Sequence, residues 1–300
     1  SDAATPKNVV AKLETSNART ILVLYGDPKP ALAAAERALA LRTDDPRTFA
    51  EAHLHAGLSL LRAGSVTEGA MRMRKALAAA SRGPYNRLIA LIVQSLATAY
   101  AAAGNFAAAR EASWEALRLF RAAGSHRLAA LNAPNLAEFE FAEGHTATAL
   151  ELTLESVAYF REHRVWSELG WALGNVSAYL IAEDRFDEAR THARESLVLA
   201  CESRHGAWLA LALQHLAAVA ALDPNRAREL QSLFRAANLL GYVNESAAHA
   251  GFRRETTEQR EYERIVPILR EKLGTRFDQL LNAGSSWPED RAVAEALGMP

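Results

Sequence analysis

The sequence predicts an all-α protein built from repeated helical hairpins, and two observations lead to this prediction. Of the 300 residues, 63 are Ala and 41 are Leu, whereas only 13 are Val and 6 are Ile. Such a chain is rich in strong helix formers and poor in β-branched residues. In addition, signals that end a helix recur every forty residues along most of the sequence. A chain of this length can bury a sizeable core.

The forty-residue period appears in columns of equivalent positions. The helix-ending column holds Gly64, Gly104, Gly144, Asp184 and Pro224. One column of small residues holds Gly57, Ala97, Ala137, Ser177 and Ala217. Two more hold Gly69, Ala109, Ala149 and Ala189, and Ala76, Ala116, Ser156, Ser196 and Ala236. Small side chains let the two helices of a hairpin approach closely. Because one hairpin cannot bury its own apolar face, we expect the hairpins to stack into a solenoid.

The period divides residues 1–245 into six hairpins with helices of about 15 to 17 residues. The six units are approximately 8–45, 46–85, 86–125, 126–165, 166–205 and 206–245. The first helix of the first unit is expected to begin near residues 6–9. In the fourth unit, Pro134 either kinks the first helix or marks a late helix start near Ala133. In the last unit, the turn at 222–225 is expected to end one helix and to cap the next.

Residues 246–300 depart from the period and are expected to form capping helices, which cover the end of a solenoid. Thr256 and Gln259 can form a capping box, which would open a helix that runs to about Leu273. Its apolar side is expected to hold Tyr262, Ile265, Val266, Leu269 and Leu273. Pro267 should kink or divide this helix. Two shorter helices are predicted, one from Phe277 to Gly284 and one after Pro288.

Residues 96–116 resemble the tetratricopeptide repeat (TPR). The matching residues are Leu96, Ala97, Tyr100, Gly104, Phe106, Ala109 and Ala116. The resemblance implies a right-handed α-solenoid whose concave groove is lined by the first helix of each hairpin and binds a protein or peptide segment. The repeat is longer than the usual period of about 34 residues, and we assign the surplus to longer helices.

The end of the chain resembles the C-terminal helical-repeat sensor region of large bacterial ATP-binding transcription regulators and nucleotide-cyclase regulators. The matching segments are 236–241, 262–264, 269–270, 273–274, Phe277 and 292–297. Pro267 and Leu281 depart from that pattern. The resemblance implies the regulatory part of a bacterial signalling or transcription regulator. The sequence has no phosphate-binding loop motif and no separate basic recognition helix.

The charge and cysteine content argue against several classes of function. Lys and Arg number 34 and Asp and Glu number 35, so no net charge attracts nucleic acid or an anionic membrane. No apolar run reaches the roughly 18 residues of a membrane span. The single Cys201 excludes an intrachain disulfide and a thiolate metal site, and it suits a reducing cytoplasm. We expect a cytoplasmic protein without a cofactor.

The sequence offers no catalytic or metal-binding constellation. His53 and His55 are two residues apart and cannot share a metal on one helix face. The carboxylates Glu138, Glu140 and Glu143 are interpreted as a solvated or ion-paired helix face. The run from Arg253 to Arg264 is interpreted as a salt-bridged helix face, because it interleaves arginines with glutamates. We therefore predict that the chain is not an enzyme.

Two alternatives stay open at this stage. One is a structural assembly scaffold. The other is an enzyme with its site in the irregular C-terminal segment, where the dense polar cluster is Tyr242, His249, Arg253 and Glu255.

One column of polar residues indicates a binding surface. Just before the small residue in each predicted first helix stand His55, Ser95, Asn135, Asn175 and His215. In TPR domains, Asn on this face commonly holds the backbone of an extended peptide, so the resemblance implies that Asn135 and Asn175 anchor a ligand. The neighbouring positions, which could supply pockets, are Gln94, Glu138, Trp171 and Gln214. Alternatively, the column faces water or links adjacent first helices by hydrogen bonds.

The expected partner is a protein or peptide segment, another domain of the same polypeptide, or a small effector. The sequence does not identify the ligand, and it leaves the oligomeric state open.

Overall fold

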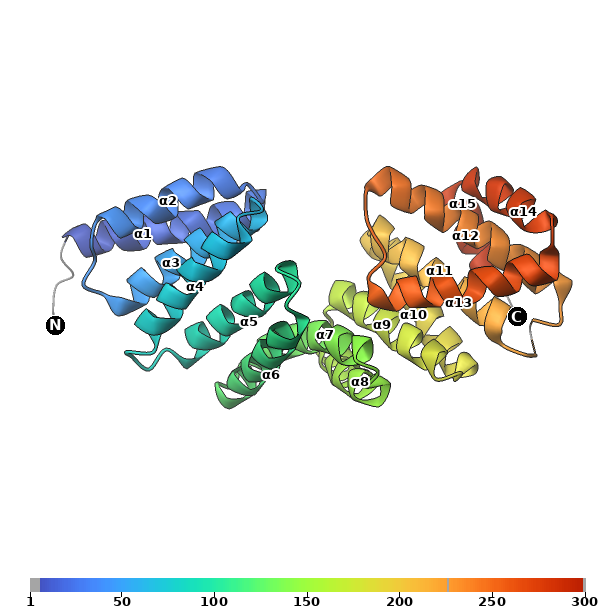
Figure 1. Cartoon of the computed structure of the whole chain (residues 1–300), viewed down its shortest axis with the longest axis horizontal. Coiled ribbons are helices and arrows are strands. Elements are labelled where there is room, and N and C mark those ends of the chain that lie inside the picture. Colours follow the sequence, from blue (N-terminus) through green and yellow to red (C-terminus); the bar gives the residue numbers. More distant parts are fainter. Residues whose placement is uncertain (1–5, 226, 299–300) are drawn as a thin grey trace. The chain divides into compact units, whose positions relative to one another are not determined.

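The structure, a computed structural model, describes residues 6–225 and 227–298. These residues form fifteen α-helices and one short π-helical segment, with no strand among them (Figure 1). The predicted all-α class is therefore confirmed. The chain divides into two compact units between Asn132 and Ala133, and each unit is described by itself.

The first unit is a series of helices that each pack against the next along the chain. Its elements are α1 (Pro6–Thr20), η1 (Ile21–Tyr25), α2 (Pro28–Ala40), α3 (Pro46–Arg62), α4 (Val66–Ala80), α5 (Asn86–Ala102), α6 (Phe106–Ala122) and the beginning of α7 (His126–Ala142). Apart from α2, which has 13 residues, the α-helices have the predicted 15 to 17 residues, and α1 begins where it was expected. The core between α3, α4 and α5 is built from Ala, Leu, Met73 and Ile92.

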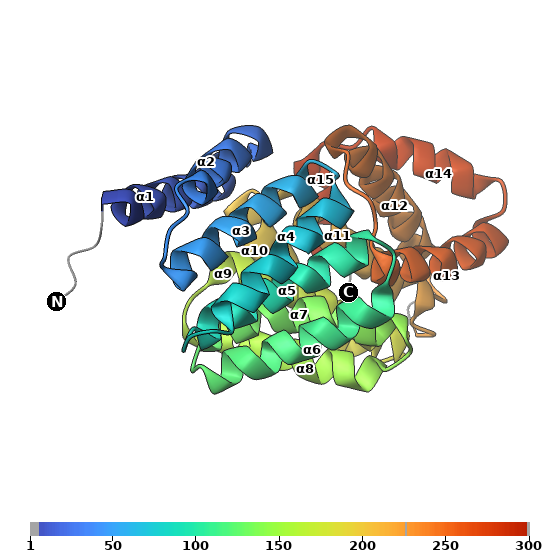
Figure 2. The same cartoon turned by 60° about the vertical axis from the view of Figure 1, so that its left-hand side comes forward.

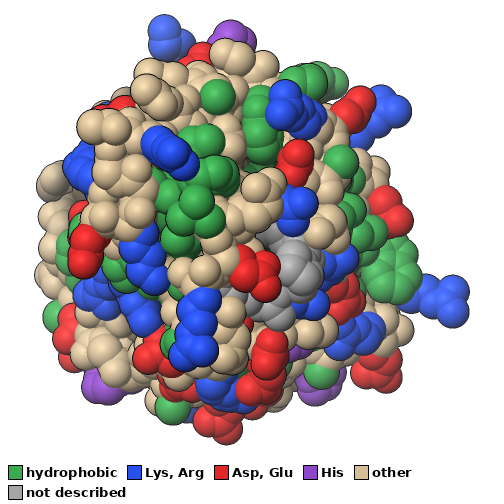
Figure 3. Space-filling model, turned by 90° about the vertical axis from the view of Figure 1, so that its right-hand side faces the viewer, with side chains coloured by type: hydrophobic (Ala, Val, Ile, Leu, Met, Phe, Trp, Pro, Cys, Tyr) green, Lys and Arg blue, Asp and Glu red, His purple; other side chains and the backbone are tan. Residues whose placement is uncertain are grey.

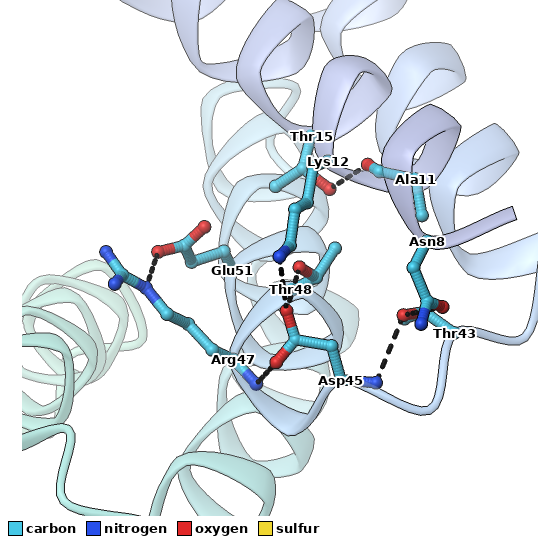
Figure 4. Close-up of polar contacts among 9 residues, drawn as sticks. All are labelled: Asn8, Ala11, Lys12, Thr15, Thr43, Asp45, Arg47, Thr48 and Glu51. Atoms are coloured by element: carbon cyan, nitrogen blue, oxygen red, sulfur yellow. Dashed lines mark hydrogen bonds and ion pairs between the residues drawn. The ribbon is translucent and has the colours of Figure 1, made fainter. Parts of the chain in front are cut away.

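The start of α3 shows how short polar side chains fix a helix end in this unit. Asp45 caps the helix, because its side chain accepts a hydrogen bond from the backbone N–H of Arg47 (3.1 Å) and another from the Thr48 hydroxyl (2.7 Å). Lys12 of α1 lies 3.4 Å from the same carboxylate (Figure 4). Partial burial alone would raise the pKa of Asp45, but these hydrogen bonds outweigh it and lower that pKa. The cap thus links α1 to the beginning of α3.

The small-residue columns have the packing role that the period predicts. A Cβ atom on Gly57 of α3 would lie 2.9 Å from the carbonyl oxygen of Gly69 on α4, and one on Gly69 would lie 2.8 Å from the oxygen of Gly57. The helix-ending column is also confirmed in its conformation. Its members Gly64, Gly104, Gly144 and Asp184 have φ angles of 84°, 75°, 89° and 58°, in the left-handed region that ends a helix.

The second unit continues from the end of α7 with more hairpins and then the C-terminal helices. Its further elements are α8 (Thr146–Glu162), α9 (Trp166–Ala182), α10 (Phe186–Ser203), α11 (Gly206–Leu222), α12 (Leu230–Ala250), α13 (Thr256–Leu273), α14 (Arg276–Ser285) and α15 (Glu289–Leu297). Helices α9 and α11, the first helices of adjacent hairpins, pack against each other, and α13 packs on both. Helix α12 contacts α13 and α14 at the C-terminal end of this unit (Figure 2).

Two expectations about helix ends are corrected. Pro134 lies inside α7, which begins at His126, so the late start near Ala133 is wrong. The turn at 222–225 ends α11 at Leu222 as predicted, but it does not cap the next helix, because α12 begins only at Leu230. The Asp223 side chain instead accepts a hydrogen bond from the backbone of Asn225 (2.9 Å).

Helix α13 has the predicted length but a different start. Its capping box is formed by Glu255 and Glu258, one residue earlier than the predicted pair Thr256 and Gln259. A glutamate can replace the usual threonine at this position, because its carboxylate also accepts a hydrogen bond from the free backbone N–H group. Pro267 lies within α13 and does not divide it. The two short helices after it, α14 and α15, lie where the sequence predicts them.

Candidate functional site

Four polar side chains of the first helices in the second unit lie close to α13, and we call them the polar strip. They are Glu138 of α7, Tyr179 of α9, and Gln214 and His215 of α11. Gln214, His215 and Tyr179 are at most 1 % exposed. The other buried residues of α9 and α11 are apolar or glycine, except Asn175 and Ser177 of α9. Since buried polar groups need hydrogen-bond partners, the segment that packs on the strip must offer hydrogen-bonding groups.

Helix α13 supplies the partners of Gln214 and His215. The Gln214 side-chain amide donates to the backbone oxygen of Glu258 (2.9 Å) and to the Glu261 carboxylate (3.0 Å). The other oxygen of Glu261 lies 2.9 Å from Nδ1 of His215. One carboxylate on α13 thus bridges two neighbouring residues of α11.

Glu138 sits between the repeats and α13. It accepts a hydrogen bond from the Tyr179 hydroxyl (2.7 Å) and another from the Thr257 hydroxyl of α13 (2.5 Å). Burial, together with the negative charge of Glu258, raises the pKa of Glu138 to about 7. The group is therefore close to half-protonated near neutral pH.

Arg254, just before α13, closes one edge of the strip. Its guanidinium donates to the side-chain oxygens of Gln214 (2.5 Å) and Asn244 (2.7 Å). It also lies over the ring of Tyr262, 4.2 Å from the ring centroid. The strip, α12 and α13 are joined through this one side chain.

Two arginines on the next turns of α13 contact the ends of the first helices. Arg260 donates to the carbonyl oxygens of Phe141 (3.0 Å) and Ala142 (2.8 Å) at the end of α7. Arg264 donates to the carbonyl oxygen of Ile181 (2.9 Å) at the end of α9. The last carbonyls of a helix lack helical partners and carry partial negative charge. Phe141 and Ile181 are forty residues apart, so α13 recognises the same feature in two successive repeats.

The charges around the strip shift two further pKa values. Burial alone would lower the pKa of His215, but the charge and hydrogen bond of Glu261 outweigh it and raise that pKa. Burial raises the pKa of Glu258, and the nearby His215 partly offsets this rise. The site therefore holds protons more firmly than the same groups do in water.

Part of the sequence-based view of the acidic residues is corrected here. Glu258 and Glu261 do not lie on solvated faces but are buried between helices, and Glu138 is half-buried. Glu140 is also buried and lies 2.8 Å from Nδ1 of His145, whereas Glu143 is exposed as predicted. The missed signal is the spacing, because 257, 261, 265, 269 and 273 form one continuous buried stripe on α13. Only its second half is apolar.

The other residues predicted to form the binding surface have varied surroundings. In the first unit, His55 is half-buried, and burial together with the charge of Arg19 lowers its pKa to about 4. Ser95 donates to the Leu91 carbonyl of its own helix (2.8 Å), and Gln94 is half-buried.

In the second unit, Asn135 is exposed, Trp171 is half-buried and Asn175 is buried. The structure thus brings Glu138, Gln214 and His215 together beneath α13. The anchoring role of Asn135 and Asn175 stays a prediction.

The polar cluster predicted in the C-terminal segment is split by the fold. Tyr242 and His249 line a cavity of about 320 Å³ together with Trp287 and Glu289. Glu255 instead caps α13, and Arg253 is exposed.

Among residues 6–225 and 227–298, no group of three His, Cys, Asp or Glu side chains could hold a metal ion. Within the same ranges, no helix is long and apolar enough to cross a bilayer. On the face shown in Figure 3, Lys and Arg side chains alternate with Asp and Glu rather than gathering as one sign. That face therefore has no extended basic track of the kind that follows a phosphate backbone.

Comparison with known proteins identifies the fold. No protein-family model and no curated protein matches the chain. Among solved structures, RapI in its apo form is 12% identical, with a TM-score of 0.64 over 88% of this chain and 98% of that one. The signal-transduction ATPase PH0952 from Pyrococcus horikoshii, described as having a tetratricopeptide repeat sensor, is 15% identical, with a TM-score of 0.64. That match covers 91% of this chain and 39% of the ATPase.

A third structure is a Rap protein complexed with Competence and Sporulation Factor. It is 14% identical, with a TM-score of 0.57 over 93% of this chain and 78% of that one. The fold is a tetratricopeptide-type helical-repeat solenoid. At these identities the likeness concerns the fold, and the predicted architecture is confirmed.

Proposed function

We propose that this chain is a non-catalytic regulatory module that binds a protein or peptide segment on the surface formed by the first helices of its hairpins. One observation carries the proposal. The polar strip already holds a helix from outside the repeats, because Glu138, Gln214 and His215 each share a hydrogen bond with it. A surface that recognises one segment by side-chain hydrogen bonds has the chemistry to recognise another.

The structural neighbours support a regulatory role. They include a tetratricopeptide repeat sensor of a signal-transduction ATPase and a Rap protein complexed with Competence and Sporulation Factor. By analogy, this chain would be the sensing part of a signalling or transcription regulator. The resemblance of residues 236–297 to the sensor end of such regulators supports the same assignment.

Binding to the predicted anchors can be tested with peptides. A display library of short random peptides would be selected against the full chain, and the affinities of the selected peptides would be measured by calorimetry. Replacing Asn135 and Asn175 together by Ala should weaken binding about tenfold or more, because each removes a hydrogen bond worth about 1 kcal/mol. Asn282→Ala, on the exposed side of α14, is the matched control.

Two results would contradict the proposal. One is a selection that yields no peptide dependent on the first-helix surface. The other is a double variant that changes affinity by less than about 0.5 kcal/mol, below the usual worth of one hydrogen bond.

A further inference from the structure

Helix α13 consists of two halves that are held in different ways. In residues 256–264 the buried side chains are Thr257, Glu258 and Glu261, all polar. In residues 265–273 the buried side chains are Ile265, Leu269 and Leu273, all apolar. The first half is thus held by the polar strip and by the ends of α7 and α9. The second half is held by the burial of these three apolar side chains.

Pro267 lies near the start of the second half. It has no N–H group, so the carbonyl of Glu263 has no helical hydrogen bond to accept. Helices bend most readily at such a position. The first half can therefore move while the apolar side chains of the second half stay buried.

The two halves differ in what it costs to release them. Side-chain hydrogen bonds to the strip exchange for hydrogen bonds to water, and the buried pair of His215 and Glu261 has already lost its hydration. Water can satisfy Glu138, Gln214 and His215 again when the first half leaves. By contrast, releasing Ile265, Leu269 and Leu273 would expose apolar surface without compensation. The first half is therefore the part that opens.

We propose that the first half of α13 is a resident and exchangeable ligand of the polar strip, and that the partner of this module presents a helix with the same pattern. This inference rests on the proposed function and names its partner class. The partner would be an amphipathic helix that competes with residues 256–264. Binding of the partner would then release residues 256–264 from the polar strip. This release would be the structural signal that the partner is bound.

The pattern follows from the contacts of α13. In the partner helix, a hydrogen-bond donor would bind Glu138, as Thr257 does in α13. A carboxylate one turn later would bind Gln214 and His215, as Glu261 does. Arginines at the positions of Arg260 and Arg264 meet the carbonyl ends of two first helices. Positions 257, 260, 261 and 264 share one face only in a helix. An extended strand would turn alternate residues away, so the strip is suited to a helical partner.

A peptide competition on the full chain tests this inference. The probe is a synthetic, end-capped and fluorescently labelled peptide of residues 254–273. The key variant is Glu261→Gln, which weakens the hold of α13 and leaves the polar strip unchanged. Because the tethered helix competes with the probe, loosening it should raise the probe's affinity about tenfold or more over the wild-type chain. His215→Ala, introduced together with Glu261→Gln, should remove that gain.

The matched control is Glu263→Gln, which removes the same charge from an exposed position of α13 and should leave the probe's affinity at the wild-type value. Equal affinity of the probe for the wild-type chain and Glu261→Gln would overturn the inference. So would a gain that survives His215→Ala.

Hydrogen exchange on the unmodified chain supplies a test that needs no variant. Amides of residues 258–266 should exchange about tenfold faster than those of α11. Amides of residues 268–273 should instead exchange at the slow rate of the C-terminal helices. A common slow rate for both halves and α11 would identify α13 as a permanent cap and overturn the inference.

The experiments also separate this inference from the proposed function. Library-selected peptides that bind wild type and Glu261→Gln equally well would leave the proposed function standing and reject α13 as the competitor. If Glu261→Gln and wild type both fail to bind any selected peptide or the probe, both the proposed function and this inference are rejected.

Discussion

At the scale of single residues, Glu138 is an acid that folding removes from water. Burial and the charge of Glu258 raise its pKa from 4.5 to about 7, although Thr257 and Tyr179 donate hydrogen bonds to it. Between these two pH values the folded chain holds a proton that the unfolded chain has released. The free energy of unfolding therefore falls as pH rises through this window, by about 3 kcal/mol in total.

Glu138→Gln should reduce this pH dependence, because the amide resembles the protonated acid at every pH. Near pH 8 the variant should be more stable than the wild-type chain by up to about 3 kcal/mol, and near pH 4.5 the two should be nearly equal. Urea denaturation across this range measures the difference. Glu143→Gln, at an exposed position, is the control. An unchanged slope in Glu138→Gln would contradict the buried position of this carboxyl.

At the scale of elements, α12 and α14 touch backbone to backbone. A Cβ atom on Gly284 would overlap the carbonyl oxygen of Asn238, and one on Gly241 would overlap that of Leu281. Both glycines therefore serve close approach of two helices. The contact belongs to the C-terminal helices that follow the last hairpin.

Gly284→Ala should destabilise the chain by about 1–3 kcal/mol, because the added methyl group must push the two helices apart. Gly206→Ala is the matched control, since a Cβ there meets no atom within 4 Å, and alanine suits a helix better than glycine. Urea denaturation of both variants gives the comparison. A Gly284→Ala variant within about 0.5 kcal/mol of the wild-type chain would show that the helices approach less closely.

At the scale of the whole molecule, the two units carry buried titratable groups of opposite behaviour. In the first unit, burial and nearby positive charges lower the pKa values of His53 and His55 to about 4. In the second unit, burial raises the pKa of Glu138 and Glu258, and against the effect of burial Glu261 raises that of His215. The first unit loses stability as pH falls from 6.5 to 4, because the unfolded histidines take up protons. Glu138, Glu258 and His215 make the second unit lose stability as pH rises, whereas the lowered pKa of His192 acts in the opposite direction.

Hydrogen exchange with mass spectrometry should therefore show opposite trends in the two units. After correction for intrinsic exchange rates, lowering the pH from about 8 to about 5 should reduce the protection of α3 and raise that of α11 and α13. His53→Asn combined with His55→Asn should abolish the loss in α3 and leave the second unit unchanged. Parallel changes in both units would contradict the assignment of these groups.

The fold could be predicted from the sequence because its determinants are local or periodic. Helix formers, the helix-ending column and small residues such as Gly57 and Gly69 act within one hairpin or between neighbours, so their spacing reports the architecture directly. Helix ends are set by single side chains and turns, so the sequence pattern missed the cap at Glu255 and the start of α12 at Leu230. The polar column and its neighbouring positions named His215, Glu138 and Gln214, which the structure brings together beneath α13.

By itself, the sequence determined a helical-repeat solenoid with a C-terminal cap and a polar column on the first helices. Only the tertiary structure decided that α13 covers the polar strip. The residues that meet there are far apart in the chain, as Thr257 and Glu138 are, 119 positions apart, and no local pattern encodes such a pairing. From the sequence alone, a glutamate on a helix is predicted to face solvent, because the surface that packs against it is not known. Burial then turns it into a partner for His215 and into a group whose pKa the fold controls.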